Sequence, residues 1–216
     1  DSSLLLRSDL FDPLLDRAAS DFDVRHSFNV GATYEIPAPF ANKAMRRIFG
    51  GFALDAIFYA RSATPVDITY SRSTPFGFIN LRPDLVSGVP LYLEDANAPG
   101  TIRFNNTRTA TTPTNQTGAF VAPVEIRQGT LSRNALRGFP LYQLDLAARR
   151  TFGLTERVRL QFRAEAFNIF NRPNFSDPSG TLNYTAPTVA APLGTLTAPA
   201  TFGVSASQLR SSLGGL

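Results

Sequence analysis

The chain has 216 residues and a formal net charge of +4, with 43% hydrophobic and 11% aromatic residues. This composition is too apolar for a disordered chain, and the length fits a single domain. Cysteine is absent and His26 is the only histidine. Disulfide scaffolds, thiolate metal sites and two-histidine zinc sites are therefore excluded.

The positive charge is carried almost entirely by arginine, because Lys43 is the only lysine. The arginines are spread along the chain, and the largest clusters are pairs such as Arg46-Arg47 and Arg149-Arg150. A nucleic-acid-binding protein usually gathers its basic residues on one face, so we expect no nucleic-acid partner. The chain contains no run of 18 apolar residues, which argues against a membrane-spanning helix.

The first half of the chain predicts two long strands, because apolar and polar residues alternate with a period of two. The first strand covers His26–Ile36 and the second covers Gly51–Ser62. Within the connection Pro37–Gly50, the segment Phe40–Phe49 predicts a short basic amphipathic helix. A weaker strand is expected at Pro65–Tyr70.

The second half predicts a hairpin, because Leu141–Phe152 and Arg157–Asn168 alternate in the same way on either side of Gly153. One face of this hairpin is expected to be apolar and the other charged. The expected members of the apolar face are Tyr142, Leu144, Leu146, Val158, Leu160 and Phe162.

Two long segments rich in Thr, Asn, Pro and Gly remain, Ser71–Pro140 and Asn171–Leu216. The layout therefore has strands of about 11 residues, short turns at one end and long polar loops at the other. Membrane-spanning barrels have strands of about 9–11 residues and the same asymmetry, whereas soluble sandwiches have shorter strands and loops of similar length at both ends. The pattern favours a barrel over a sandwich.

In a barrel, arginine on the lipid face costs roughly 2–4 kcal/mol near the midplane, so Arg159 and Arg163 must face the lumen. Arg150 lies on the apolar side, but it is close to the turn, where the cost is small. Aromatic residues are expected in two bands at the membrane boundaries. The turn-end band comprises Phe152, Tyr34 and Phe49, and the loop-end band comprises Tyr142, Phe139, Phe167 and Phe170.

Two passages carry a family resemblance. The first is Ser20–Pro37, with the sequence SDFDVRHSFNVGATYEIP, and the second runs from Arg137 through the hairpin to Phe175. The second passage ends in FNIFNRPNF, which fits an FNxFNxPNF pattern. Both passages resemble the barrel of TonB-dependent outer-membrane receptors, most closely an Oar-like branch common in acidobacteria, whose members often carry an N-terminal carboxypeptidase-regulatory-like domain.

The resemblance implies an all-β fold, an antiparallel meander forming part of a transmembrane β-barrel with long extracellular loops and short periplasmic turns. It implies a Gram-negative outer membrane, a 22-stranded barrel with an N-terminal plug, and uptake of an unidentified extracellular solute. The expected partners are outer-membrane lipid, that solute and, through the plug, the inner-membrane TonB complex. Because the chain starts at Asp1 and lacks the family's plug and last strand, residues 1–216 are interpreted as an incomplete C-terminal part of the barrel.

No catalytic, cofactor or metal site is expected, and the protein is not expected to be an enzyme. His26 has no serine elbow or second histidine to form a catalytic group with. Two oxygen-rich clusters have too few ligands for calcium, which needs six or more oxygens. These clusters are Asp21 and Asp23 with Arg17 and Arg25, and Glu94 with Asp95 and Asn97.

Two further groups of residues leave alternatives open. The charged ladder Arg157, Arg159, Arg163 and Glu165 is interpreted as a salt-bridged lumen wall or, less favoured, as a stripe that contacts the plug or a solute. The triplets that begin at Asn105, Asn115, Asn174 and Asn183 match N-x-Ser/Thr, but an outer-membrane setting gives no reason to expect glycans.

Solute contacts are expected from Ser71–Pro140 and Asn171–Ala200, although the individual contact residues stay unknown. The polar and aromatic residues available there are Arg72, Phe76, Phe78, Arg82, Tyr92, Arg103 and Phe104. The alternative function is a soluble β-rich carbohydrate-binding or adhesive module, in which Tyr92 and Phe104 would stack on sugars.

Overall fold

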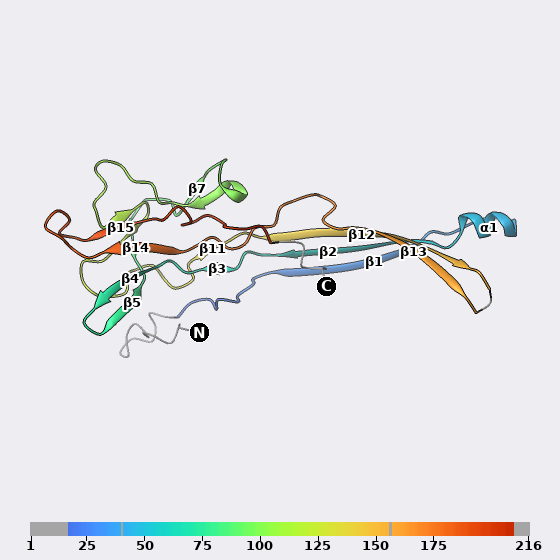
Figure 1. The fold of residues 1–216 in the computed structure, drawn as a ribbon, viewed down its shortest axis with the longest axis horizontal. Helices are drawn as coiled ribbons and strands as arrows, with labels where there is room; N and C mark the ends of the chain where they lie inside the picture. Colours follow the sequence, from blue (N-terminus) through green and yellow to red (C-terminus); the bar gives the residue numbers. More distant parts are fainter. Residues whose placement is uncertain (1–16, 40, 156, 210–216) are drawn as a thin grey trace. The chain divides into compact units, whose positions relative to one another are not determined.

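The computed structural model describes residues 17–39, 41–155 and 157–209, which fall into two compact units. The sheet unit takes the described residues of 24–62 and 140–174, together with 209. The loop unit takes 17–23, 63–139 and 175–208. Each unit is described by itself (Figure 1).

The sheet unit is a four-stranded antiparallel sheet in the order β1-β2-β12-β13. Its strands are β1 (Ser27–Glu35), β2 (Phe52–Arg61), β12 (Leu141–Gly153) and β13 (Arg159–Ala166). All four strands lie within two residues of the bounds expected from the alternation. The expected antiparallel meander is confirmed, and within the described residues the sheet is open, with β1 and β13 at its edges.

The register keeps apolar side chains together across all four strands. Phe58 of β2 lies opposite both Val30 and Leu144, and Phe152 lies opposite Leu160. The predicted hairpin is confirmed with its predicted faces, since the rings of Phe152 and Phe162 are 5.8 Å apart, except that Val158 precedes β13 and lies outside the paired residues. We call this side of the sheet the apolar face. Its members are Phe28, Val30, Ala32, Tyr34, Phe52, Leu54, Ala56, Phe58, Ala60, Tyr142, Leu144, Leu146, Ala148, Arg150, Phe152, Leu160, Phe162, Ala164 and Ala166.

At one end of the sheet, the turn end, β1 and β2 are joined through α1 (Lys43–Phe49). The side chain of Asn42 accepts a hydrogen bond from the Ala44 N–H (2.8 Å) and so caps the helix. This helix confirms the one expected within Phe40–Phe49, of which Phe40 lies outside the described residues. No described helix is long and apolar enough to cross a bilayer.

The chain returns from α1 to the sheet through Gly50 and Gly51. Gly51 has φ +78°, a conformation that favours glycine, and a Cβ atom there would lie 2.5 Å from the carbonyl oxygen of Thr151. The Thr151 N–H donates to the Gly51 carbonyl (2.9 Å). Glycine therefore lets the end of the helix lie close against β12.

The loop unit contains four small sheets. The largest has the order β15-β14-β4-β5, and the others are β6-β10-β9, β11-β3 and β7-β8. The expected strand Pro65–Tyr70 is divided between β3 and the start of β4. The bounds are β3 Pro65–Val66, β4 Thr69–Thr74, β5 Gly77–Leu81, β6 Asp84–Leu85, β7 Tyr92–Glu94, η3 Pro99–Thr101, β8 Ile102–Phe104, β9 Gln116–Thr117, β10 Phe120–Val121, β11 Leu136–Arg137, β14 Thr181–Thr185 and β15 Thr195–Thr197.

Two segments far apart in the sequence build this unit together. β4 from the first long segment pairs in parallel with β14 from the second, with Leu182 opposite Tyr70. The ring of Phe202 packs against Phe104 and Phe120 at centroid distances of 5.9 and 5.6 Å. The fully buried core members are Ile68, Tyr70, Phe104, Phe120, Leu131, Leu136, Leu182, Leu196 and Phe202.

The two segments expected as polar loops therefore form a packed body with its own hydrophobic core. The expectation was incomplete because strands of two to six residues are too short to show a clear alternation. The core residues come instead from scattered positions that only the tertiary contacts bring together.

We predict that Phe104→Ala destabilises the loop unit by about 3–5 kcal/mol, because it removes a buried ring and leaves a cavity. Phe104 is 1% exposed, whereas Phe76 is fully exposed. The matched control Phe76→Ala should therefore change stability by less than about 0.5 kcal/mol. Limited proteolysis and thermal unfolding of the detergent-solubilised protein measure both variants. Equal protease resistance in the two variants would contradict the packed loop unit.

Candidate functional site

The polar face of the sheet carries a network of charged side chains. Asp55 accepts a hydrogen bond from the Thr33 hydroxyl (2.7 Å) and forms an ion pair with Arg149 (3.1 Å). On β13, Arg163 pairs with Glu165 at 2.6 Å. All four residues of the predicted ladder are exposed, and Arg163 and Glu165 form an ion pair within it. This arrangement supports the interpretation of this face as a salt-bridged wall.

The apolar face has an aromatic residue at each end of β12. Tyr142 lies near the loop end, and Phe152 lies ten residues further on at the turn end. At about 3.3 Å per residue this is about 33 Å along the strand. With a strand tilt of about 40°, the span is about 25 Å, the height of the apolar band of a membrane barrel.

An arginine stacks on the aromatic residues at each end of this span. Near the loop end, the guanidinium carbon of Arg172 lies 3.7 Å from the ring centroid of Tyr142. At the turn end, that of Arg150 lies 4.4 Å from Phe52 and 4.1 Å from Phe152. Arginine and aromatic side chains in pairs suit a boundary between water and lipid, where one end of each side chain is apolar and the other polar.

Arg150 is the one charged member of the apolar face, and its contacts explain its position. Its guanidinium donates hydrogen bonds to the carbonyl oxygens of Arg47 and Ile48 in the last turn of α1. These carbonyls have no partner within the helix and carry its partial negative charge. Arg150 therefore binds α1 to the apolar side of the sheet at its turn end.

The other expected boundary residues agree with this division, with one exception. Tyr34 lies at the turn end opposite Leu54, and Phe49 ends α1. Phe167 and Phe170 follow β13 and are exposed. Phe139 was wrongly assigned to the loop-end band, because it belongs to the loop unit, where its ring packs against Phe175 at 5.6 Å.

The FNIFNRPNF passage forms a specific turn after β13. Asn168 and Asn171 have φ angles of +49° and +47°, a region that asparagine tolerates better than most residues. The Asn168 N–H donates to the Asp145 carboxylate (2.8 Å), and its side-chain amide donates to the Arg172 carbonyl (2.8 Å). The buried Asn174 accepts a hydrogen bond from the Tyr142 N–H (3.3 Å). The asparagines of this motif thus have a structural role at the loop end.

In the loop unit, several residues considered for solute binding are part of the framework. Phe104 and Arg82 are buried, and Tyr92 packs edge-on against Phe104 while its hydroxyl bonds to the backbone of Arg137. Arg103 forms an ion pair with Asp95 at 2.9 Å. The expectation that these residues are available for stacking was wrong for Phe104 and Arg82, because both side chains are buried in the loop unit. The sugar-stacking role considered for Phe104 is wrong for the same reason.

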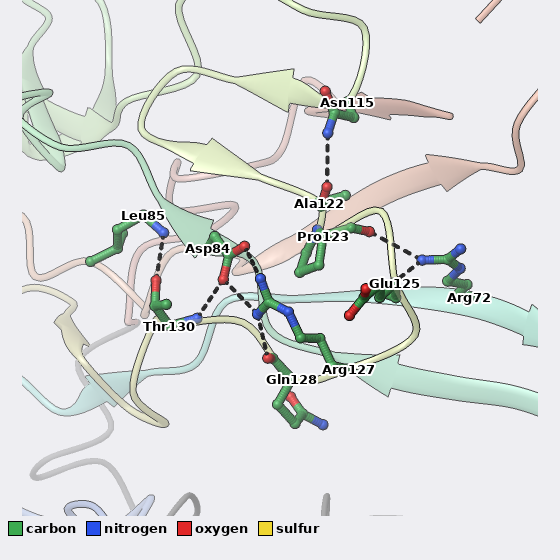
Figure 2. A network of polar contacts seen from close by, with 10 residues as sticks. All are labelled: Arg72, Asp84, Leu85, Asn115, Ala122, Pro123, Glu125, Arg127, Gln128 and Thr130. Carbon is green, nitrogen blue, oxygen red and sulfur yellow. Dashed lines mark hydrogen bonds and ion pairs between the residues drawn. The ribbon is translucent and has the colours of Figure 1, made fainter. Parts of the chain in front are cut away.

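Arginine side chains hold the segment 122–130 in place (Figure 2). Arg72 donates hydrogen bonds to the carbonyl oxygens of Pro123, Val124 and Glu125 at 2.9–3.2 Å. Arg127 binds both carboxylate oxygens of Asp84 at 2.9 and 2.6 Å. Asn115 donates to the Ala122 carbonyl at 2.9 Å. These contacts order a segment that contains no strand, so that it presents a defined surface.

The charged pair in this network affects the pKa of its carboxyl group. Burial opposes the ionisation of Asp84, but the hydrogen bonds from Arg127 and from the Thr130 N–H outweigh it and hold the pKa below its ordinary value of 3.8. Burial raises the pKa of the Tyr70 hydroxyl to about 12. Asp84 is therefore ionised and Tyr70 protonated at neutral pH.

Two expected solute-binding residues remain exposed on the β4–β5 hairpin. Phe76 is 100% exposed and Phe78 77% exposed. The Thr74 hydroxyl donates to the Gly77 carbonyl (2.8 Å) and accepts from the Phe76 N–H (3.2 Å), which fixes the turn between the two strands. Among the residues considered, these two phenylalanines have the chemistry of contact residues.

The remaining candidate residues are committed elsewhere. Asp21 pairs with Arg133 (2.9 Å) and Asp23 with Arg137 (2.6 Å), rather than with the neighbouring Arg17 and Arg25. The described residues contain no group of three His, Cys, Asp or Glu residues that could hold a metal ion. His26 is exposed beside β1, and its backbone N–H donates to the Ser62 hydroxyl (3.1 Å). Of the four triplet asparagines, Asn105, Asn115 and Asn174 are buried.

We predict that Asp84→Asn lowers the stability of the loop unit by about 1 kcal/mol at neutral pH, a value reduced by the 46% exposure of Arg127. Because the folded-state pKa of Asp84 is depressed, its contribution is present above the ordinary value of 3.8 and is lost as the pH falls through the folded-state pKa. Thermal unfolding from pH 7 to pH 2.5 measures the effect, with the exposed Glu94→Gln as control. A difference between wild type and Asp84→Asn that persists undiminished below pH 3 would contradict this assignment.

The comparisons with known proteins agree with this geometry. The family described as outer membrane beta barrel domain matches residues 5–212. Comparison with curated proteins and with solved structures gives no match. The match puts the protein in the outer membrane, in contact with its lipid, and leaves the soluble module without support. From its antiparallel meander, its apolar face and this match over nearly all of its length, the chain belongs to the outer membrane beta barrel domain family.

Proposed function

We propose that the chain is a C-terminal part of a TonB-dependent receptor, and that its loop unit presents the surface that recognises an extracellular solute. One observation carries this proposal: two long segments leave a lipid-facing sheet and fold together around a shared core. A barrel that served only as a membrane anchor would need no such packed body. Recognition usually lies on loops that a rigid scaffold displays.

The topology of the sheet supports the proposed orientation. Leu141 begins β12 directly opposite Arg61, the last residue of β2, so the first long segment leaves and re-enters at the loop end. The second segment follows β13, which also ends there. Short connections at the opposite end suit the periplasmic side of an outer-membrane barrel, and long ones suit the outside.

Energised uptake by way of TonB is supported by the resemblance of two passages, Ser20–Pro37 and Arg137–Phe175. Its test uses the intact protein in cells with and without a functional TonB complex. Labelled ferric chelates, cobalamin, oligosaccharides and peptides are supplied in turn, because fold does not fix the ligand. We expect one class to accumulate only when both the receptor and TonB are present. Equal accumulation without TonB would refute energised uptake.

We predict that the variant Thr111→Cys reacts with a membrane-impermeant maleimide in whole cells, and that the variant Gly153→Cys does not. Thr111 is exposed in the loop unit, and Gly153 lies at the turn end, where a Cβ atom meets nothing within 4 Å. The sequence contains no cysteine, so no native thiol adds background labelling. Labelling at position 153 alone would show that the proposed orientation is inverted.

We predict that Phe76→Ser with Phe78→Ser weakens binding of the accumulated solute class at least about tenfold, because exposed aromatic side chains make the strongest recognition contacts. The control is Val189→Ser, which changes an equally exposed side chain elsewhere in the loop unit. Both variants should insert and resist protease as the wild type does. Unchanged uptake in the double variant would exclude the β4–β5 hairpin as the recognition element.

A further inference from the structure

The helix α1 is amphipathic, and the side chains of its apolar side are largely exposed. Met45, Ile48 and Phe49 follow the spacing of one helix face, and their side chains are between 39% and 56% exposed. Lys43 and Arg47, one turn apart, line another side of the helix and are exposed. A short helix with one apolar and one basic side suits the boundary of a membrane, where it lies in the plane of the lipid headgroups.

A hollow of about 380 Å³ lies between the end of this helix and the turn end of β12. Arg46 and Arg47 line it on the helix side, and Thr151, Phe152 and Leu154 line it on the hairpin side. Gly50 and Gly51 also line it, and they contribute only backbone atoms. The hollow thus has a cationic side for an anionic group and an apolar side for hydrocarbon.

The hollow lies beside the apolar face of the sheet, because Phe152 belongs to that face and also lines the hollow. Arg150 extends from the apolar face to the helix carbonyls, so the end of α1 lies beside that face. On the same face, a second hollow of about 510 Å³ begins at Tyr34 and Leu54 and is bordered by Ala148 and Ala164. The cationic lining of the first hollow suits an anionic headgroup, and the apolar lining of the second suits a hydrocarbon chain.

We propose that α1 and the hollow beside it bind the headgroup of an anionic phospholipid in the periplasmic leaflet, with an acyl chain along the alanine-lined part of the apolar face. The assignment to that leaflet rests on the proposed orientation of the barrel. Charge complementarity selects an anionic headgroup over a zwitterionic one, because Lys43, Arg46 and Arg47 gather three positive charges on a helix with no acidic residue in its first turn.

The test measures lipids retained by the intact protein in non-ionic detergent, with phosphatidylglycerol and phosphatidylethanolamine added in equal amounts and counted by native mass spectrometry. Wild type should prefer phosphatidylglycerol. Arg46→Gln with Arg47→Gln should reduce that preference about 25-fold, at about fivefold for each charge near a lipid surface. The matched control is Arg25→Gln with Arg159→Gln, which removes the same charge from exposed positions outside the hollow and should keep the preference.

Two further variants keep the result independent of folding defects. Arg46→Lys with Arg47→Lys retains the charge and should retain the preference, and Lys43→Gln at the exposed start of the helix should lower it about fivefold. Equal retention of the two lipids by wild type, or an unchanged preference in the double glutamine variant, would overturn the lipid site. Labelling at position 153 in whole cells would instead overturn the leaflet assignment together with the proposed orientation. Since the lipid measurement is made in detergent, the two failures are distinguishable.

Discussion

The shared register of four strands is the constraint on which the rest of the molecule depends. Because side chains alternate along a strand, a slip of one residue at any strand pair would turn that strand's apolar side chains to the lumen and its charged ones to lipid. The pairing of Phe58 with Val30 and Leu144 fixes this register in the middle of the sheet. With no water in the bilayer, the edges β1 and β13 must also find neighbouring strands, since unpaired backbone groups in lipid are costly.

The same constraint explains where the sheet tolerates an exception. Arg150 is on the lipid-facing side, yet it lies close to the turn, three residues before the end of β12, and its guanidinium stacks on the rings of Phe52 and Phe152. Its stacked guanidinium and its bonds to α1 satisfy a charge that the middle of the same strand could not hold. Arg172 likewise stacks on Tyr142 at the other boundary. The two arginines mark the ends of the apolar band more sharply than the aromatic residues alone.

The loop unit follows a different rule, because it buries a hydrophobic core of its own. Its strands are short, so main-chain pairing alone would not hold it, and arginines bonded to carbonyl oxygens supplement the core. Arg72 with the segment 123–125, and Arg127 with Asp84, act in this way. The result is an ordered surface from which the β4–β5 hairpin projects Phe76 and Phe78.

The sequence predicts the sheet well and the loop unit poorly, for a physical reason. In a long strand whose two faces meet different environments, apolar and polar residues alternate along the sequence. The bounds of β1, β2, β12 and β13 could therefore be predicted to within two residues. In the loop unit, Tyr70 pairs with Leu182 and Phe104 packs against Phe202, and both of these partners lie beyond the hairpin, where no local pattern reveals them. Phe104 and Phe76 looked equally suited to solute contact in the sequence, and only the structure shows that the first is buried and the second exposed.

The parallel pairing of β4 with β14 has a consequence for how the protein matures. Thr69 and Thr181 are paired in the structure although β12 and β13 lie between them in the chain. Contacts between such distant segments form late, because the chain entropy of closing the intervening loop must first be overcome. The loop unit therefore reaches its complete core only after the second long segment has joined the first.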